Sequence, residues 1–244
     1  AQGHIELTGQ RFGFDEVQVQ SGAACYYLEG VVSDLGGDSP DLDMHVQASE
    51  GRLEQLLSVI GVDLNARGQV DGELVFAGPF GQIGSHGKVT VKGVELYGET
   101  VEEAEGEYSW DDGEVYLRDV QARSHDGSLL VNGVVAVDGA CMRLNVDLKD
   151  WSLQAIQEAR LLVPGWRGRL SWSGNVEGSV RQPTLAGRLV ARDLTIGQAD
   201  FPMVEGEIDF DGQDLRSTGL MATTLDGGSW WLTGRGREAR TTRL

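Results

Sequence analysis

The sequence predicts an all-β fold, an elongated and curved antiparallel sheet with one short helix per repeat. Apolar residues alternate with polar or charged residues over short stretches, which is typical of strands with one apolar and one solvent-exposed face. Asp-Gly dipeptides, which favour tight hairpins, separate many of these stretches. The whole pattern returns after 100 residues, which indicates a repeated block of strands.

Six stretches have the clearest alternation and are predicted as strands. They lie at residues 42–48, 89–91, 108–110, 144–148, 189–191 and 208–210. Asp-Gly dipeptides predict turns at residues 71–72, 112–113, 126–127, 138–139, 211–212 and 226–227. Strands of about ten residues joined by such short turns make an antiparallel meander.

Two segments have helical periodicity instead. Apolar residues recur at three- and four-residue spacing over residues 52–60 and again over residues 152–162. Pro164 and Gly165 end the second segment. Each repeat is therefore expected to hold about six strands and one short helix.

The repeat is visible when the sequence is shifted by 100 positions. The glycines then keep register without a gap, because Gly68, Gly78, Gly87 and Gly106 fall on Gly168, Gly178, Gly187 and Gly206. At a shift of 103, the N-terminal Gly3, Ile5 and Leu7 fall on Gly106, Tyr108 and Trp110. We expect the C-terminal part of a truncated repeat at residues 1–30, followed by repeats at residues 31–133 and 134–244. All three would belong to one continuous sheet domain, which is a fragment of a longer natural protein.

A sheet of this size cannot stay flat in water if one of its faces is apolar. Strongly twisted sheets of more than about ten strands curl, split or stack. Closure would give a barrel or solenoid filled by its own side chains, whereas incomplete closure would leave an apolar trough. The strand pattern is compatible with both outcomes.

The charge balance excludes one class of partner. Twenty Lys and Arg residues stand against 38 Asp and Glu residues, which gives a formal net charge of −18. Such a chain has no general electrostatic attraction for nucleic acid or for anionic membrane surfaces. No stretch approaches the roughly 18 uninterrupted apolar residues of a membrane-spanning helix, so none is expected in this segment.

The sequence offers no catalytic or metal-binding motif, so we expect neither an enzyme nor a cofactor. His4, His45, His86 and His125 are scattered, without ligand spacing to one another or to a cysteine. The acidic loop at residues 34–43 lacks EF-hand spacing, and a solvated loop is favoured over a calcium site. A glycosidase-like carboxylate pair stays open as an alternative, because residues distant in sequence can meet in the fold.

The second repeat resembles the repeats of a known family. Residues 151–165 combine a short helical segment with a closing Pro-Gly, and residues 168–178 contain a Gly-x-Leu strand followed by Val-x-Gly. Residues 182–196 add a Pro-x-Leu-x-Gly turn and an alternating strand that ends in Asp-Leu-x-Ile. This order is similar to that of the TamB/AsmA-like superfamily. The resemblance covers about residues 31 to 235, although the first repeat departs from it at residues 79–84.

The resemblance implies a repeating β-groove, also called a β-taco, in which a U-shaped sheet has an apolar inner face. Members of this superfamily are anchored in the inner membrane of double-membraned bacteria and extend through the periplasm towards the outer membrane. The resemblance therefore implies a periplasmic segment that moves phospholipids between the two membranes, assists outer-membrane protein assembly, or does both. It also implies an inner-membrane anchor and a contact with an outer-membrane TamA/BamA-like barrel protein, through parts outside this segment.

If phospholipid acyl chains slide along such a groove, the apolar members of the alternating strands would line it. These residues are Val46, Val89, Val91, Tyr108, Trp110, Val146, Leu170, Leu189, Ala191, Ile208 and Phe210. The alternative for each of them is ordinary sheet core, in a structural or adhesive β-repeat module that binds no lipid. Neither interpretation requires a metal, a cofactor or nucleic acid.

Overall fold

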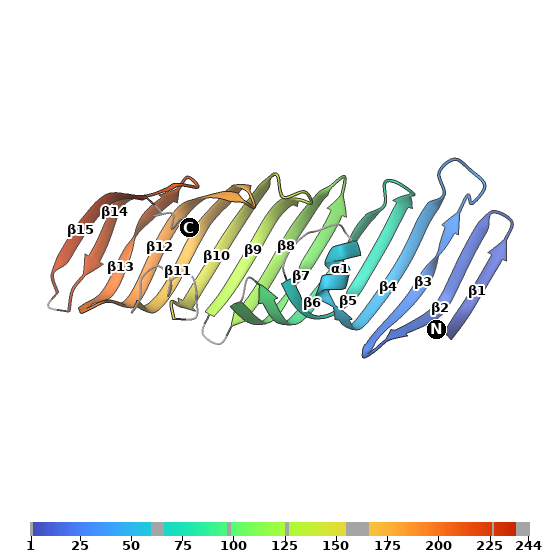
Figure 1. The fold of residues 1–244 in the computed structure, drawn as a ribbon, viewed down its shortest axis with the longest axis horizontal. Helices are drawn as coiled ribbons and strands as arrows, with labels where there is room; N and C mark the ends of the chain where they lie inside the picture. The colour runs from blue at the N-terminus through green and yellow to red at the C-terminus, as the bar shows by residue number, and fades with distance from the viewer. Residues whose placement is uncertain are drawn as a thin grey trace, which may run out of the picture. The chain divides into compact units, whose positions relative to one another are not determined.

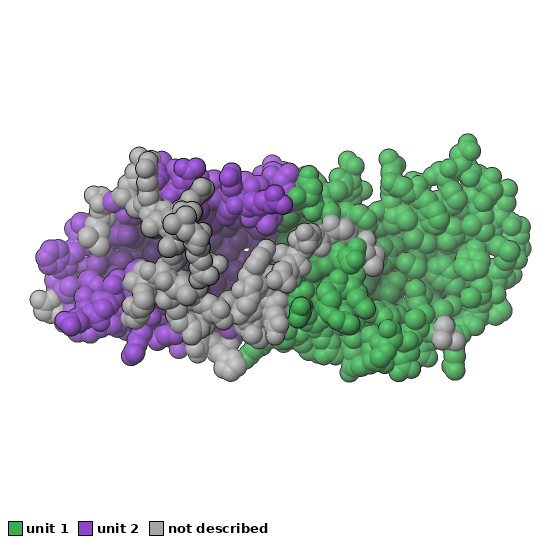
Figure 2. Space-filling view, in the orientation of Figure 1, with its two compact units in different colours: residues 1–122, 134–138 green, residues 123–133, 139–244 purple. Residues whose placement is uncertain are grey.

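Fifteen strands and one helix make up the part of the chain that the structure describes. The structure is a computed structural model, and it describes residues 2–59, 66–96, 99–124, 127–154, 166–225 and 227–237. The chain divides into two compact units (Figure 2). Unit 1 comprises residues 1–122 and 134–138, and unit 2 comprises residues 123–133 and 139–244.

The strands follow one another along the chain (Figure 1). The first eight are β1 (Gln2–Thr8), β2 (Arg11–Ser21), β3 (Ala24–Ser33), β4 (Asp41–Arg52), β5 (Ala66–Pro79), β6 (Gly84–Leu96), β7 (Glu99–Asp111) and β8 (Glu114–Ser124). The other seven are β9 (Gly127–Ala136), β10 (Met142–Ser152), β11 (Arg167–Ser179), β12 (Gln182–Ile196), β13 (Ala199–Phe210), β14 (Asp214–Thr223) and β15 (Ser229–Arg237). The helix α1 (Leu53–Val59) lies between β4 and β5 in the chain.

Within each unit, consecutive strands pair side by side and run antiparallel. In unit 1 this pairing extends from β1 to β7, and in unit 2 from β10 to β15. The prediction of an all-β antiparallel meander is therefore confirmed.

The turns were predicted in part. At the hairpin between β7 and β8, Asp112 and Gly113 have φ angles of 45° and 76°, which suit a tight Asp-Gly turn. The turn predicted at Asp71 and Gly72 is wrong, because both residues lie inside β5. A Cβ at Gly72 would lie 2.5 Å from Lys88 O of β6, so this glycine allows two strands to approach closely. The predicted turn residues Asp126 and Asp226 lie outside the described residues.

The prediction of one helix per repeat is not borne out, because α1 is the only helix among the described residues. The first predicted segment forms α1 directly after Arg52, the last residue of β4, and Ser152 is likewise the last residue of β10. The Leu153 N–H then donates a 3.0 Å hydrogen bond to Gly168 O of β11. Residues 155–162 of that prediction lie outside the described residues.

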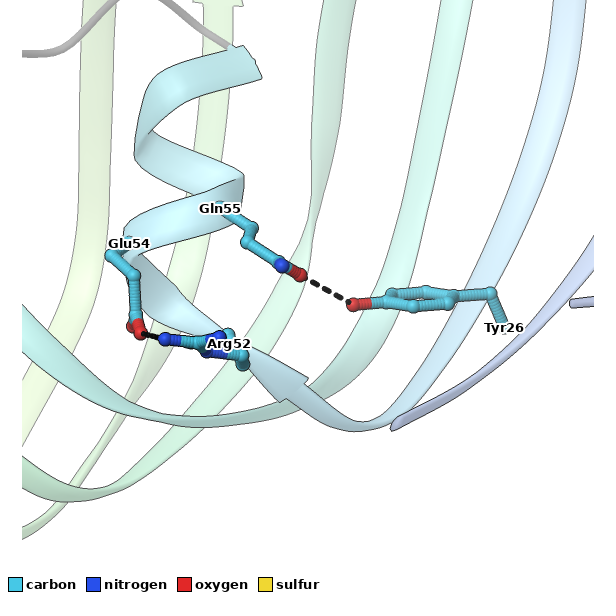
Figure 3. Close-up of polar contacts among 4 residues, drawn as sticks. All are labelled: Tyr26, Arg52, Glu54 and Gln55. Carbon is cyan, nitrogen blue, oxygen red and sulfur yellow. Dashed lines mark hydrogen bonds and ion pairs between the residues drawn. The ribbon is translucent and has the colours of Figure 1, made fainter. Parts of the chain in front are cut away.

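A residue with a left-handed backbone interrupts every even-numbered strand from β2 to β14. These residues are Glu16 (φ 48°), Glu50 (53°), Gly93 (60°), Asp119 (49°), Asp150 (49°), Asp193 (51°) and Gly219 (84°). Strand pairing shifts register at Glu16, Glu50 and Asp150, and the pairing of β11 with β12 shifts at Asp193, which identifies β-bulges there. A bulge bends its strand and increases the local twist, and Figure 3 shows strands of unit 1 curving beneath α1.

Glycines on neighbouring strands make room for these left-handed positions. A Cβ at Gly106 of β7 would lie 2.7 Å from the Cα of Val120, the residue after Asp119. A Cβ at Gly168 of β11 would lie 2.9 Å from Asp193 O. Real Cβ atoms do not tolerate contacts this short, so part of the high glycine content serves strand approach at the bulges.

Two clusters of buried apolar side chains lie 100 residues apart in the chain. In unit 1, Val70, Val91 and Val94 are buried and pack against Leu53 of α1 and Ala104. The cluster in unit 2 contains Leu153, Ala191, Leu194, Val204 and Ala222, with Leu170 packed against it. Six positions of the first cluster, 53, 70, 91, 94, 101 and 104, thus recur at 153, 170, 191, 194, 201 and 204. The bulges at Glu50 and Asp150 are related by the same shift.

Candidate functional site

One face of the sheet in unit 1 carries the apolar side chains. On β4, Leu42, Met44 and Val46 are half-buried and Ala48 is buried, whereas the residues between them are exposed. Leu53 of α1 packs on this same face, against the buried cluster. We call this the inner face and the opposite one the outer face. The inner face of unit 2 is the face that carries the corresponding residues.

The predicted lining residues of unit 1 all lie on its inner face. Val46 pairs through Leu74 and Gly87 with Tyr108, in a row that runs across β4 to β7. The neighbouring row ends at Trp110 of β7. Two more predicted residues, Val89 and Val91, occupy the next inner positions of β6.

The predicted lining residues of unit 2 also share one face. The rows across β10 to β13 join Val146 through Gly174 and Gly187 to Ile208, and Leu148 through Trp172 to Leu189. Two further rows join Trp151, Leu170, Ala191 and Val204, and Leu144, Val176, Leu185 and Phe210. Each row contains at least one of the predicted residues Val146, Leu170, Leu189, Ala191, Ile208 and Phe210.

The inner face is neither sealed nor fully exposed. Among the eleven predicted residues, Val91 and Ala191 are buried in the two clusters, with 8 % and 3 % exposure, and the other nine are half-buried. No large side chain in the described ranges is completely buried. A filled solenoid would bury such side chains fully, so these accessibilities favour an inner face that solvent or a ligand can reach.

A polar cluster lies among the apolar side chains of the inner face of unit 1. Ser85, Tyr108 and Trp110 form it, and the Ser85 and Tyr108 hydroxyl oxygens are 2.7 Å apart. Burial raises the pKa of the Tyr108 phenol above its ordinary value of 10.0, while the bond to Ser85 opposes this, so the phenol is protonated at neutral pH. The sequence prediction included the two aromatic residues as apolar lining and missed Ser85. Ser85 alternates with Gly87 and Val89 along the strand, and this position was the sequence signal that could have placed it on the inner face.

Indole N–H groups add to the polarity of the apolar side. The Nε1 atoms of Trp110, Trp166 and Trp172 are buried and have no hydrogen-bond partner in the described part of the chain. Trp172 lies on the inner face of unit 2, opposite Leu148 and Leu189. The described interior therefore holds donors as well as hydrocarbon.

The outer face is charged and forms short ion pairs between strands. Arg188 Nη2 lies 2.6 Å from Glu205 Oε2, and Lys92 Nζ lies 3.2 Å from Asp71 Oδ2. Both cationic side chains are more than half exposed, so each pair adds little to stability. Because acids outnumber bases, the chain as a whole keeps its negative charge.

A contact between α1 and β3 fixes the inner face of unit 1 at one end (Figure 3). Tyr26 OH donates a hydrogen bond of 3.5 Å to Gln55 Oε1 of the helix, and Arg52 bonds Glu54 Oε1 through Nε at 2.8 Å. The Glu54 pKa is lowered, first by a hydrogen bond from its own backbone N–H and then by Arg52. The acid at the start of α1 also suits the positive end of the helix dipole.

A separate depression of about 770 Å³ lies at β1 to β4. It is lined by polar side chains of the outer face, among them His4, Asp15, Glu29, His45 and Gln47. None of the predicted lining residues borders it, although Leu28, the cross-strand partner of Val46, does.

The described residues give no sign of metal chemistry. No group of three or more His, Cys, Asp or Glu residues among them could hold a metal ion. The acidic loop at residues 34–43 is included in this statement, and it closes with a 3.0 Å bond from the Gly37 N–H to Asp34 O. None of the described helical residues forms a helix long and apolar enough to cross a membrane.

No protein-family model, curated protein or solved structure matches the chain. The resemblance to TamB/AsmA-like repeats therefore rests on the sequence pattern alone. Function has to be argued from the chemistry of the two inner faces.

Proposed function

We propose that the chain is a periplasmic segment of a TamB/AsmA-like protein whose inner face forms a hydrophobic groove for phospholipids. The groove would carry acyl chains between the inner and outer membranes, and the same protein would support outer-membrane protein assembly. The observation that carries this proposal is the row of half-buried apolar side chains across neighbouring strands, such as Leu144, Val176, Leu185 and Phe210 in unit 2.

The physical basis of transport is burial of hydrocarbon. Moving a methylene group from water to an apolar surface is favourable by about 0.8 kcal/mol, so an acyl chain gains from lying along the inner face. Because a row continues from strand to strand, an acyl chain can slide along it in steps between apolar side chains. The head group would stay in solvent, and no covalent reaction is required.

The acidic surface fits this role. A net charge of −18 keeps the protein soluble and repels it from anionic membrane surfaces. Attachment to the inner membrane, and contact with an outer-membrane TamA/BamA-like barrel protein, would depend on parts of the protein outside this segment.

Two neighbouring residues on β13 provide the sharpest test. Ile208 faces inward and is half-buried, whereas Glu207 beside it is exposed on the outer face. A photo-crosslinking amino acid placed at position 208 should capture phospholipid in bacterial cells, and the same probe at position 207 should not. The adduct is read by mass spectrometry of the purified protein.

The outcome separates the proposal from its main alternative. Equal capture at both positions would indicate nonspecific contact with lipid. No capture at position 208, together with no phospholipid in the purified chain, would favour a structural or adhesive module.

A further inference from the structure

The polar cluster of unit 1 lies inside an apolar row. Ser85 on β6 is 4 % exposed, and its Oγ lies 2.7 Å from the Tyr108 hydroxyl oxygen on β7. Trp110 is the direct cross-strand partner of Ser85, so the two side chains project from the same face. On the other side of Ser85, the row continues with Phe76 and Met44. The cluster is therefore a polar spot on an otherwise hydrocarbon surface.

Two donors of this cluster have no acceptor among the described residues. The Trp110 indole N–H is buried without a partner among the described residues, and an indole N–H can only donate. Ser85 and Tyr108 each bring one O–H, and the bond between them uses only one of these two protons. A buried donor without an acceptor destabilises the protein, so the cluster suits an occupant that supplies acceptors.

The second repeat shows that the fold does not require these polar groups. The positions 100 residues later hold Leu185, Ile208 and Phe210, and Leu185 pairs with Phe210 as Ser85 pairs with Trp110. Apolar side chains thus support the same strand pairing at the same place. The cluster in the first repeat is an addition to the fold, which indicates a role in binding.

The side chains around the cluster indicate which kind of acceptor group it can bind. Phosphate is usually bound by Arg or Lys side chains. The inner positions of β6 next to Ser85 are Gly87 and Val89, while Lys88 between them is exposed on the outer face. An uncharged acceptor such as a carbonyl oxygen therefore fits the site better than a phosphate.

We propose that Ser85, Tyr108 and Trp110 form a binding site for an acyl ester carbonyl of a diacyl phospholipid. The inference rests on the proposed function, and it adds that the glycerol ester region of the lipid enters the inner face together with the tails. The two spare donors bond ester oxygens, while Phe76 and Met44 contact the adjoining hydrocarbon.

The test compares ester and ether lipids on the whole 244-residue chain. Dioctanoyl phosphatidylcholine and its dioctyl ether analogue, both kept monomeric, compete with a fluorescent phospholipid for the purified protein. The ether analogue has the same head group and tail length but no carbonyl. We expect the ester lipid to bind about 3- to 10-fold more tightly, as one or two net hydrogen bonds would give.

Variants assign this preference to the cluster. Trp110→Phe and Tyr108→Phe, alone and combined, should move the ester-to-ether ratio towards 1 while the ether lipid binds as before. Trp231→Phe changes an indole that is 72 % exposed and should leave the ratio unchanged. Circular dichroism shows whether each variant is folded, and the comparison of the two lipids on the unaltered protein does not depend on any variant.

The possible failures are distinct. If both lipids bind the unaltered protein equally well, or if the double variant keeps the full ratio, the carbonyl site is wrong and the lipid groove survives. If neither lipid displaces the probe and the probe itself does not bind, the proposed function fails.

Discussion

The Glu50 backbone N–H donates a 2.9 Å hydrogen bond to Asp71 Oδ1, from the bulge of β4 to the neighbouring β5. The other oxygen of the same carboxylate, Oδ2, lies 3.2 Å from Lys92 Nζ on β6. One carboxylate thus links three strands at the bend. The bulge of β10 is also joined to the next two strands, but through other groups. The Asp150 N–H donates to Ser171 Oγ of β11 at 3.0 Å, and Arg192 of β12 lies 3.2 Å from Asp150 Oδ1.

Replacing Asp71 should destabilise the protein in a pH-dependent way. The bond from the Glu50 N–H and the charge of Lys92 lower the Asp71 pKa below its ordinary value of 3.8. A depressed pKa in the folded state gives stability that is present above the unfolded pKa and is lost as pH falls through the folded pKa. We expect Asp71→Ala to cost about 0.5 to 1 kcal/mol at pH 7 and less near pH 3.

Urea unfolding at the two pH values measures this difference. Glu73→Ala on the same strand is the control, because Glu73 is an exposed acid outside the bulge. A loss of the same size at both pH values would show that the charge of Asp71 does not contribute.

The bulge of β12 should accept glycine and reject a β-branched residue. Asp193 has a φ of 51°, and the position 100 residues earlier is Gly93 with a φ of 60°. Asp193→Gly is expected to change the free energy of unfolding by less than about 0.5 kcal/mol, because relief of strain offsets the greater entropy of the unfolded chain. Asp193→Val should cost about 1 to 3 kcal/mol, because valine is strained at positive φ.

Denaturant unfolding of the two variants gives both values. Glu207→Val places the same side chain at an exposed strand position without a positive φ, and it should be tolerated. If Asp193→Val proves as mild as Glu207→Val, the left-handed backbone at position 193 is not maintained in solution.

Gly168 should be far less replaceable than Gly197. Both have positive φ, 134° and 63°, but a Cβ at Gly168 would lie 3.0 Å from Leu194 Cα, whereas nothing lies within 4 Å of one at Gly197. Gly197→Ala carries the backbone cost alone, about 1 kcal/mol, and Gly168→Ala adds a steric cost that brings the loss to about 2 to 4 kcal/mol.

Thermal and denaturant unfolding of the two glycine variants test this ranking. Equal losses would mean that backbone strain alone decides both positions. That result would show that the close approach of two strands does not explain why residue 168 is a glycine.

Deprotonation of Tyr108 should lower the free energy of unfolding at high pH. Burial raises the Tyr108 pKa above 10.0, so the folded state holds this proton more tightly than the unfolded state. Its contribution to stability is complete below pH 10 and falls as the pH rises through the folded pKa. Tyr108→Phe should therefore reduce the loss of stability between pH 9 and pH 11.

Stability measured across that range, together with tyrosinate absorbance, checks the effect. Tyr116→Phe is the matched control, because Tyr116 is 47 % exposed. A Tyr108→Phe protein whose stability falls as steeply as that of the unaltered chain would contradict this role of burial.

Alternation predicted six of the strands, β4, β6, β7, β10, β12 and β13, and which of their side chains share a face. It works where a strand has one apolar and one charged face, so Val46 and Ile208 could be assigned to the inner face from sequence. The same rule would have placed Ser85 there, but a small polar residue carries little weight in a hydrophobic pattern.

The bulges could not be predicted, because a positive φ leaves no clear mark on the residue type. Glu16, Glu50 and Asp150 resemble ordinary solvent-facing acids. The Leu153 N–H donates to Gly168 O, a contact between segments that local periodicity does not contain.

The order of the strands has a consequence for how the chain reaches its native state. From β1 to β7 and from β10 to β15, each strand pairs with the one made just before it, so each hairpin can close without waiting for a distant segment. Assembly can then advance from the N-terminus while later residues are still being synthesised or exported. A fold with long crossing connections would leave open edges during that time, whereas this one needs protection at a single growing edge.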